Sequence, residues 1–93
     1  MVALLNSSEI QQLSSQVPEW KVEGKHLKIV KTFKDFIEAI AFVNKLVEPS
    51  ETAGHHPDIE ISYNKVTISL TSHDAGGLTP KDFDLAQQIS ALL

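Results

Sequence analysis

The spacing of apolar residues near the start of the chain predicts a helix. Asn6 can cap its first turn, and Glu9, three residues later, can bond back to the Asn6 backbone. The buried face of this helix would carry Ile10, Leu13 and Val17. Because Pro18 cannot continue the hydrogen-bond ladder, we expect the helix to end near Gln16.

Apolar and polar residues then alternate, as they do in a strand that is buried on one face. Residues 20–22 and 27–33 flank a turn that contains Gly24, and this arrangement predicts a first hairpin. One side of its longer strand would carry Leu27, Ile29, Lys31 and Phe33. Trp20 is large and mainly apolar, so we expect it in the core.

Strict alternation appears further along the chain and predicts a second hairpin. Its strands are residues 59–63 and 66–70. We expect its two-residue loop at Asn64 and Lys65, where asparagine tolerates the positive φ that such loops need and lysine does so less readily. Tyr63, next to this loop, is expected in the core.

Helical spacing separates the two hairpins. A central helix begins after Asp35 and would bury Phe36, Ile40, Val43 and Val47. Pro49 lacks a backbone N–H and crowds the preceding turn, so we expect a kink or break there, with Glu51 in a separate last turn.

A last helix runs to the end of the chain. Thr79 is its cap, Pro80 its first-turn proline and Asp82 an acidic residue three positions after the cap. The apolar face carries Phe83, Ala86, Ile89 and Leu92 or Leu93. The element order αββαββα predicts an α+β fold in one domain, residues 1–93, with a four-stranded antiparallel sheet and three helices packed on one face.

Composition removes several classes of function. The 93 residues include no cysteine, which excludes disulfides, thiol catalysis and cysteine-bound metals. The net charge is −4 and all eight basic residues are lysine, which argues against direct nucleic-acid binding. No stretch is apolar for the roughly 20 residues that a membrane span needs, and no signal segment is visible, so we expect a cytoplasmic protein without a membrane partner.

Three of the four histidines fall within residues 55–73, together with several carboxylates. The second hairpin would bring His73 back beside His55 and His56. Imidazole gives and takes protons near neutral pH, and a carboxylate can fix its tautomer. Glu51, four residues before His55, would share a helix face with it. The same stretch holds Asp58, Asp74 and Asp82.

Each of these residues also has a structural explanation. The adjacent histidines could be a solvated connection, and a helix start alone accounts for Asp82. His26 lies among lysines and is expected at the surface, outside the site. Three histidines and Glu51 could instead bind zinc, although no two histidines have the four-residue helical spacing of a zinc protease.

The sequence resembles the pterin-4a-carbinolamine dehydratase family. Seven positions match without an insertion: Glu51, His55, His56, Pro57, Tyr63, His73 and Asp82. The similarity runs from about Leu5 to the end and includes Trp20, the segments 33–36 and 42–44, and the run from Thr71 to Thr79.

The resemblance implies an αββαββα fold that forms a homodimer with sheets joined across subunits, and in some members a homotetramer built through the central helices. An unusual Pro49 in the central helix argues against a tetramer that needs a straight helix there. The implied reaction converts a 4a-hydroxytetrahydropterin substrate to the quinonoid dihydropterin with no metal or redox cofactor. This recycles the pterin after aromatic amino acid hydroxylation.

The resemblance also implies roles for individual residues. His55 and His73 are the proton donors, one for each C4a stereoisomer, and His56 holds the pterin and accepts the proton from N5. Glu51 orients or charges His55, and Asp82 lies near His73 or the substrate. Relatives of this fold also act as a dimerisation cofactor of a homeodomain transcription factor or as a Rubisco assembly factor, so a binding module is the alternative. A related pterin, as in molybdopterin metabolism, is another.

Overall fold

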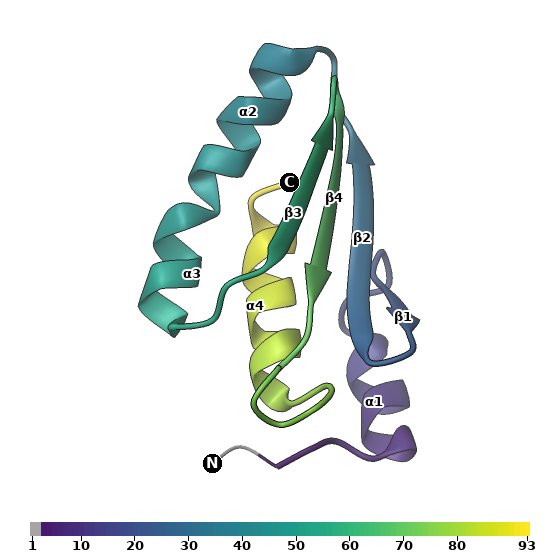
Figure 1. Ribbon diagram of the computed structural model, residues 1–93. Helices are drawn as coiled ribbons and strands as arrows, with labels where there is room; N and C mark the ends of the chain where they lie inside the picture. Colours follow the sequence, from purple (N-terminus) through teal and green to yellow (C-terminus); the bar gives the residue numbers. More distant parts are fainter. Residues whose placement is uncertain (1–2) are drawn as a thin grey trace.

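Four antiparallel strands form one sheet in the order β1-β2-β4-β3 (Figure 1). The structure is a computed structural model that describes residues 3–93. The strands are β1 (Lys21–Glu23), β2 (His26–Thr32), β3 (Asp58–Ser62) and β4 (Lys65–Leu70). The helices are α1 (Ser7–Ser14), α2 (Phe36–Lys45), α3 (Val47–Ala53) and α4 (Pro80–Ala91).

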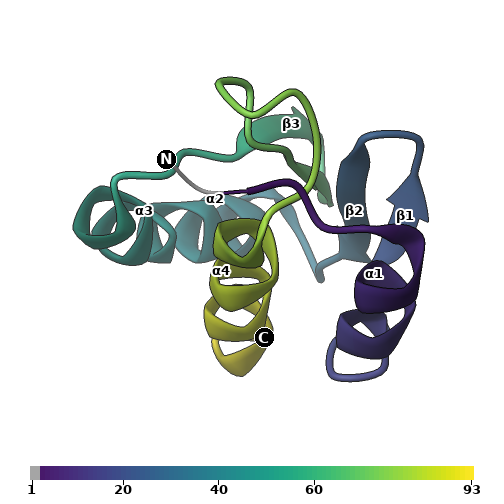
Figure 2. The same cartoon turned by 90° about the horizontal axis from the view of Figure 1, so that it is seen from below.

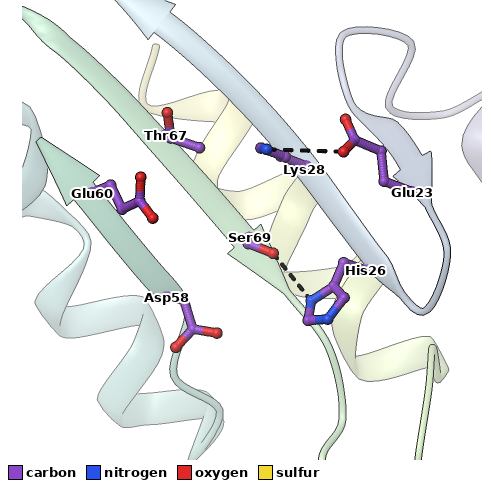
Figure 3. A pocket seen from close by; sticks show the side chains of 7 residues that line it. All are labelled: Glu23, His26, Lys28, Asp58, Glu60, Thr67 and Ser69. Atoms are coloured by element: carbon purple, nitrogen blue, oxygen red, sulfur yellow. Dashed lines mark hydrogen bonds and ion pairs between the residues drawn. The ribbon is translucent and has the colours of Figure 1, made fainter. Parts of the chain in front are cut away.

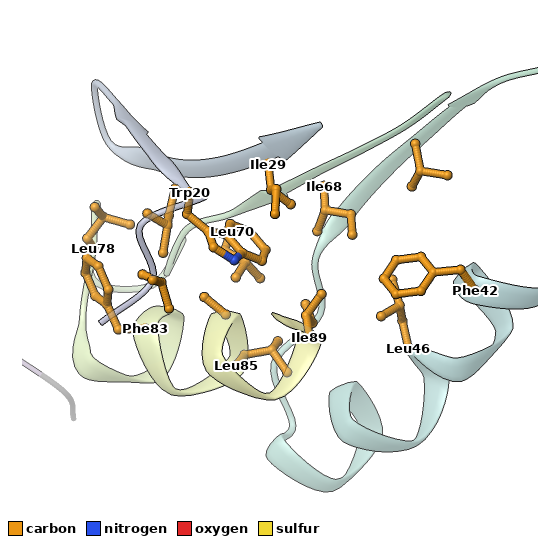
Figure 4. Packing of buried hydrophobic residues seen from close by; sticks show 14 of the residues in the cluster. Trp20, Ile29, Phe42, Leu46, Ile68, Leu70, Leu78, Phe83, Leu85 and Ile89 are labelled. Carbon is orange, nitrogen blue, oxygen red and sulfur yellow. The ribbon is translucent and has the colours of Figure 1, made fainter. Parts of the chain in front are cut away.

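All of these helices lie on the same side of the sheet (Figure 2). The core forms between that side and the helices, where apolar residues of β2 and β4 pack on α4 and on the α2–α3 segment (Figure 4). Its fully buried members include Leu27, Ile68, Leu70, Phe83 and Ile89. The predicted α+β class, with helices on one face, is confirmed.

The predicted helix starts are confirmed in detail. Asn6 and Glu9 form a reciprocal capping box, with distances of 2.8 and 2.9 Å between backbone nitrogen and side-chain oxygen. Thr79 is the cap of α4, and Pro80 is its first residue. Trp20 is 4% exposed, as expected for a core residue.

The predicted central helix is two helices, and its break lies before Pro49. The helix α2 ends at Lys45 and α3 starts at Val47, with Leu46 between them. Proline is tolerated in the first turn of a helix, where a backbone N–H has no partner within the helix. The chain therefore restarts the helix just before Pro49 and keeps it in that first turn.

The turn of the second hairpin is one residue earlier than expected. Ser62 pairs with Lys65, so the loop is Tyr63 and Asn64, and Tyr63 takes a φ of 52°. Asn64 is fixed from outside the hairpin: its side chain donates to the Phe33 carbonyl at 2.8 Å, and its own carbonyl accepts the Phe33 N–H at 2.7 Å. At the turn, Tyr63 is 65% exposed, so its expected core position is wrong.

No helix within residues 3–93 is long and apolar enough to cross a bilayer.

Candidate active site

A glycine in the left-handed helical conformation sets the positions of His55 and His56. Gly54 ends α3 with φ 61° and ψ 32°, a conformation that other residues adopt at a cost. His55 and His56 follow it on the short link to β3, beside the C-terminal end of the helix. The two neighbouring side chains reach different carboxylates.

His55 lies against a buried carboxylate from the first turn of α4. Its Nε2 is 2.5 Å from Asp82 Oδ1. The His55 side chain is 12% exposed and that of Asp82 is 0% exposed. A helix N-terminus favours negative charge. The burial and the hydrogen bond together hold the imidazole in one orientation.

The second oxygen of Asp82 is also fully engaged. Oδ2 accepts the Ser72 hydroxyl at 2.9 Å and the Thr79 backbone N–H at 3.0 Å. The Ser72 and Thr79 hydroxyls are 2.8 Å apart. Because a buried charge needs several such partners, this network explains how the carboxylate is accommodated without contact with water.

His56 has the same chemistry in an open environment. Its Nε2 is 2.5 Å from Glu51 Oε2, and the two side chains are 62% and 68% exposed. Solvent screens this pair, so it can separate at little cost when another group binds.

His73 is exposed in the loop between β4 and α4, one residue after Ser72. Backbone hydrogen bonds close this loop: the Ser72 N–H donates to the Gly77 carbonyl at 3.0 Å, and the Gly76 N–H donates to the His73 carbonyl at 3.2 Å. His73 is thus joined through its chain neighbour to the network around Asp82.

These pairs correct the expected partners. Glu51 contacts His56 and not His55, and Asp82 contacts His55. The expectation required His55 to continue the helix that carries Glu51, but Gly54 ends that helix first. Thr79 was predicted only as the helix cap, and the hydrogen bonds of Ser72 and Thr79 to Asp82 were not predicted. The available signal was two hydroxyl residues near a capped acidic helix start.

A groove of about 210 Å³ lies next to the exposed pair, between the α2–α3 segment and β3. Its lining includes the exposed Glu51 and His56 and the hydroxyl-bearing Ser50. The rest of the lining is apolar: Val43, Leu46, Val47, Pro57 and Ile59.

A second hollow, of about 420 Å³, lies on the helix-free face of the sheet (Figure 3). It contains His26, which is exposed, as expected, and hydrogen-bonded to Ser69 at 3.2 Å. Its other lining residues are Glu23, Lys28, Asp58, Glu60 and Thr67. This mixture of charges is typical of the solvated face of a sheet, and the histidine–carboxylate pairs lie elsewhere.

Within residues 3–93, no three histidine or carboxylate side chains are grouped so that they could hold a metal ion.

Comparison with known proteins gives one family over nearly the whole chain. The family described as pterin 4 alpha carbinolamine dehydratase matches residues 3–92. A protein of Cyanothece sp. that carries the provisional name pterin-4-alpha-carbinolamine dehydratase is 66% identical over 99% of this chain and 95% of its own length.

Two solved structures are similar as well. One, described as a transcriptional coactivator/pterin dehydratase from Brucella melitensis, is 29% identical with a TM-score of 0.89 and covers 95% of this chain and 96% of its own. The other is a pterin dehydratase-like protein described as a RuBisCO assembly factor in the alpha-carboxysome. It is 27% identical with a TM-score of 0.67, over 80% of this chain and 88% of its own.

Proposed function

Because this chain belongs to the pterin 4 alpha carbinolamine dehydratase family, we propose that it dehydrates a 4a-hydroxytetrahydropterin to the quinonoid dihydropterin. The observation that carries the proposal is the pair of adjacent histidines, each held by its own carboxylate. The reaction needs two proton transfers: the C4a–O bond breaks as the hydroxyl takes a proton and leaves as water, and N5 loses its proton.

The geometry supports a division of these transfers between the two rings. Asp82 engages Nε2 of His55, which leaves Nδ1 for the substrate. In the charged ring this nitrogen donates a proton to the departing hydroxyl; Asp82 keeps the ring oriented while it does so. His56, held through Nε2 by Glu51, has its own Nδ1 to accept the N5 proton. Proton exchange with solvent then returns both rings to their starting protonation states.

His73 is proposed as the second proton donor, for the opposite C4a stereoisomer. The proposal is supported by the exposure of His73 and by its place in the chain next to Ser72, which hydrogen-bonds Asp82. We also propose that residues 1–93 act as one domain in a cytoplasmic homodimer, with the pterin as substrate and no cofactor.

The test mixes purified protein with freshly generated 4a-hydroxytetrahydropterin and follows the quinonoid product by absorbance against the uncatalysed rate. We expect acceleration by the parent chain. We expect a loss of about 10²-fold or more in His55→Ala and His56→Ala, because each removes a proton-transfer group. His73→Ala should lower turnover of one stereoisomer and leave the fold intact.

The fourth histidine provides a matched control. His26 lies on the helix-free face of the sheet, so His26→Ala should keep full activity. An equal loss in His26→Ala would show that the effect is not specific to the site, and no acceleration by the parent chain would overturn the proposal.

A binding or assembly role is the second candidate, since one similar structure is described as a RuBisCO assembly factor. In that case the chain would leave the uncatalysed rate unchanged, and the three histidine variants would behave as the parent does.

A further inference from the structure

Two buried hydroxyl groups form a short chain that ends on the carboxylate of Asp82. The Thr79 and Ser72 hydroxyl oxygens are 2.8 Å apart, and Ser72 Oγ is 2.9 Å from Asp82 Oδ2. Ser72 is 3% exposed, and Thr79 and Asp82 are 0% exposed, so solvent does not reach the chain. The other oxygen of the same carboxylate, Oδ1, contacts Nε2 of His55.

The donors in this chain can be assigned from the hydrogen-bonding capacity of each group. Both described partners of Asp82 Oδ2 are donors, namely the Ser72 hydroxyl and the Thr79 backbone N–H. Such donors stabilise an ionised carboxylate, so the proton shared by Asp82 and His55 lies on Nε2 of the imidazole. Because Ser72 gives its one hydroxyl proton to Asp82, the Thr79 hydroxyl must donate to Ser72.

We propose that Ser72 is a positioning residue for the proton transfer by His55. Its hydroxyl holds one oxygen of the Asp82 carboxylate, and the other oxygen then holds the His55 ring with Nε2 protonated and Nδ1 left for the substrate. This role rests on the dehydratase function proposed above, in which Nδ1 of His55 donates the proton to the departing hydroxyl.

Loss of the Ser72 hydroxyl would disturb this arrangement without removing any group that transfers a proton. Asp82 Oδ2 would keep one described donor, the Thr79 N–H, and the Thr79 hydroxyl would lose its acceptor. A buried hydrogen-bond network that lacks one member orders its remaining members less firmly. The carboxylate can then rotate, and the neutral His55 ring can exchange between its two tautomers. We therefore expect an effect on kcat rather than on KM.

The backbone of Ser72 has a separate task, which a change of its side chain leaves in place. Its N–H donates to the Gly77 carbonyl at 3.0 Å, and its carbonyl accepts the Gly76 N–H at 2.9 Å. These bonds close the loop that carries His73. Loss of the hydroxyl alone should therefore affect the proton donor His55 and leave the proposed second donor, His73, in position.

The first test measures turnover of the two C4a stereoisomers separately. For the isomer that His55→Ala slows, we expect Ser72→Ala to lower kcat by about tenfold with KM unchanged, because the proton donor is present but less firmly oriented. Turnover of the isomer that His73→Ala slows should be unchanged. Ser72→Thr keeps a hydroxyl at this position and should restore the parent rate.

Ser90 provides a matched control. It lies in α4, as Asp82 does, and its hydroxyl accepts the Trp20 Nε1–H at 2.8 Å, far from the histidines in the chain. Ser90→Ala removes one side-chain hydrogen bond by the same substitution, and it should turn over both isomers as the parent does. Urea unfolding checks that all three variants are folded under the conditions of the assay.

The second test needs no turnover and reads the tautomer of His55 directly. NMR of the imidazole nitrogens, at a pH where the ring is neutral, should show His55 protonated on Nε2 in the parent chain, in Ser72→Thr and in Ser90→Ala. In Ser72→Ala we expect a mixture of the two tautomers and faster exchange of the Nε2 proton with water.

Two results would overturn the inference: an unchanged His55 tautomer in Ser72→Ala, or an equal loss of turnover for both isomers, which would show that the hydroxyl only supports the fold. The proposed reaction is tested separately. A change of tautomer in Ser72→Ala without any acceleration by the parent chain would refute the reaction, whereas acceleration with an unchanged tautomer would refute the role of Ser72 alone.

Discussion

The two histidine–carboxylate pairs have the same chemistry and differ in their surroundings. His55 with Asp82 and His56 with Glu51 both have 2.5 Å between nitrogen and oxygen. The first pair is 12% and 0% exposed, and the second is 62% and 68% exposed. Neighbouring residues in the sequence thus form one fixed pair and one that is free to rearrange.

The difference follows from where each carboxylate lies. Asp82 is in the first turn of α4, under the β4–α4 loop, with three hydrogen-bond donors around it. Glu51 is on the outer surface of α3, where the described contacts to its carboxylate come from His56. In the proposed reaction, the buried and fully bonded carboxylate of Asp82 would fix the proton donor in place. In the same proposal, the exposed carboxylate of Glu51 would let His56 turn towards the substrate as it binds.

Removing the buried carboxylate gives the largest expected effect. Asp82→Ala leaves His55, the Ser72 hydroxyl and the Thr79 N–H without their acceptor in the interior. We expect the free energy of unfolding to fall by about 3 kcal/mol and turnover to fall by about 10²-fold. Urea denaturation and the dehydratase assay measure the two effects.

Asp84→Ala is the control for this variant, since Asp84 lies in the same helix and is exposed. It should change stability by less than about 0.5 kcal/mol. If Asp82→Ala proved as harmless as Asp84→Ala, the distinction between a fixed and a mobile pair would be lost.

The fold could be predicted because apolar residues alternate in the strands and recur at helical spacing in the helices. The buried face of the central helix was wrong in part: Phe36 and Val47 are 50% and 59% exposed, and α2 buries Ala39 and Phe42 instead. In the second hairpin, Val66 and Ile68 alternate with polar neighbours, and both face the core as expected. The shift of the second turn could not be predicted from the hairpin alone. It depends on the contact between Asn64 and Phe33, which are 31 positions apart in the sequence.

It was easier to predict which residues form the site than to predict which carboxylate each histidine contacts. A hairpin and a helix start bring the carboxylates and histidines together, but which carboxylate each ring meets depends on one backbone conformation. Gly54 turns the chain out of α3 and directs His55 towards Asp82. The sequence shows a glycine at that position, but it does not show that the glycine has a positive φ.

Glu51→Gln tests the exposed pair and should have a smaller effect. The exposed ion pair is worth less than about 1 kcal/mol, so the unfolding midpoint in urea should hardly move. Turnover should fall by about tenfold, since a neutral amide orients the His56 ring less firmly. Glu48→Gln, on the same short helix and exposed, is the matched control. A loss of stability similar to that of Asp82→Ala would show that both pairs are fixed.

Ionic strength gives the smallest effect and distinguishes the two pairs by the salt dependence of the two variants. Raising the salt from about 0.05 M to about 0.5 M shortens the distance over which exposed charges interact, whereas buried pairs are screened much less. The stability difference between the parent chain and Glu51→Gln should therefore shrink towards zero. The difference for Asp82→Ala should stay within about 0.5 kcal/mol of its low-salt value, because Asp82 has no contact with the salt solution. Equal salt sensitivity in both variants would mean that water reaches Asp82 and that the two pairs differ only in their neighbours.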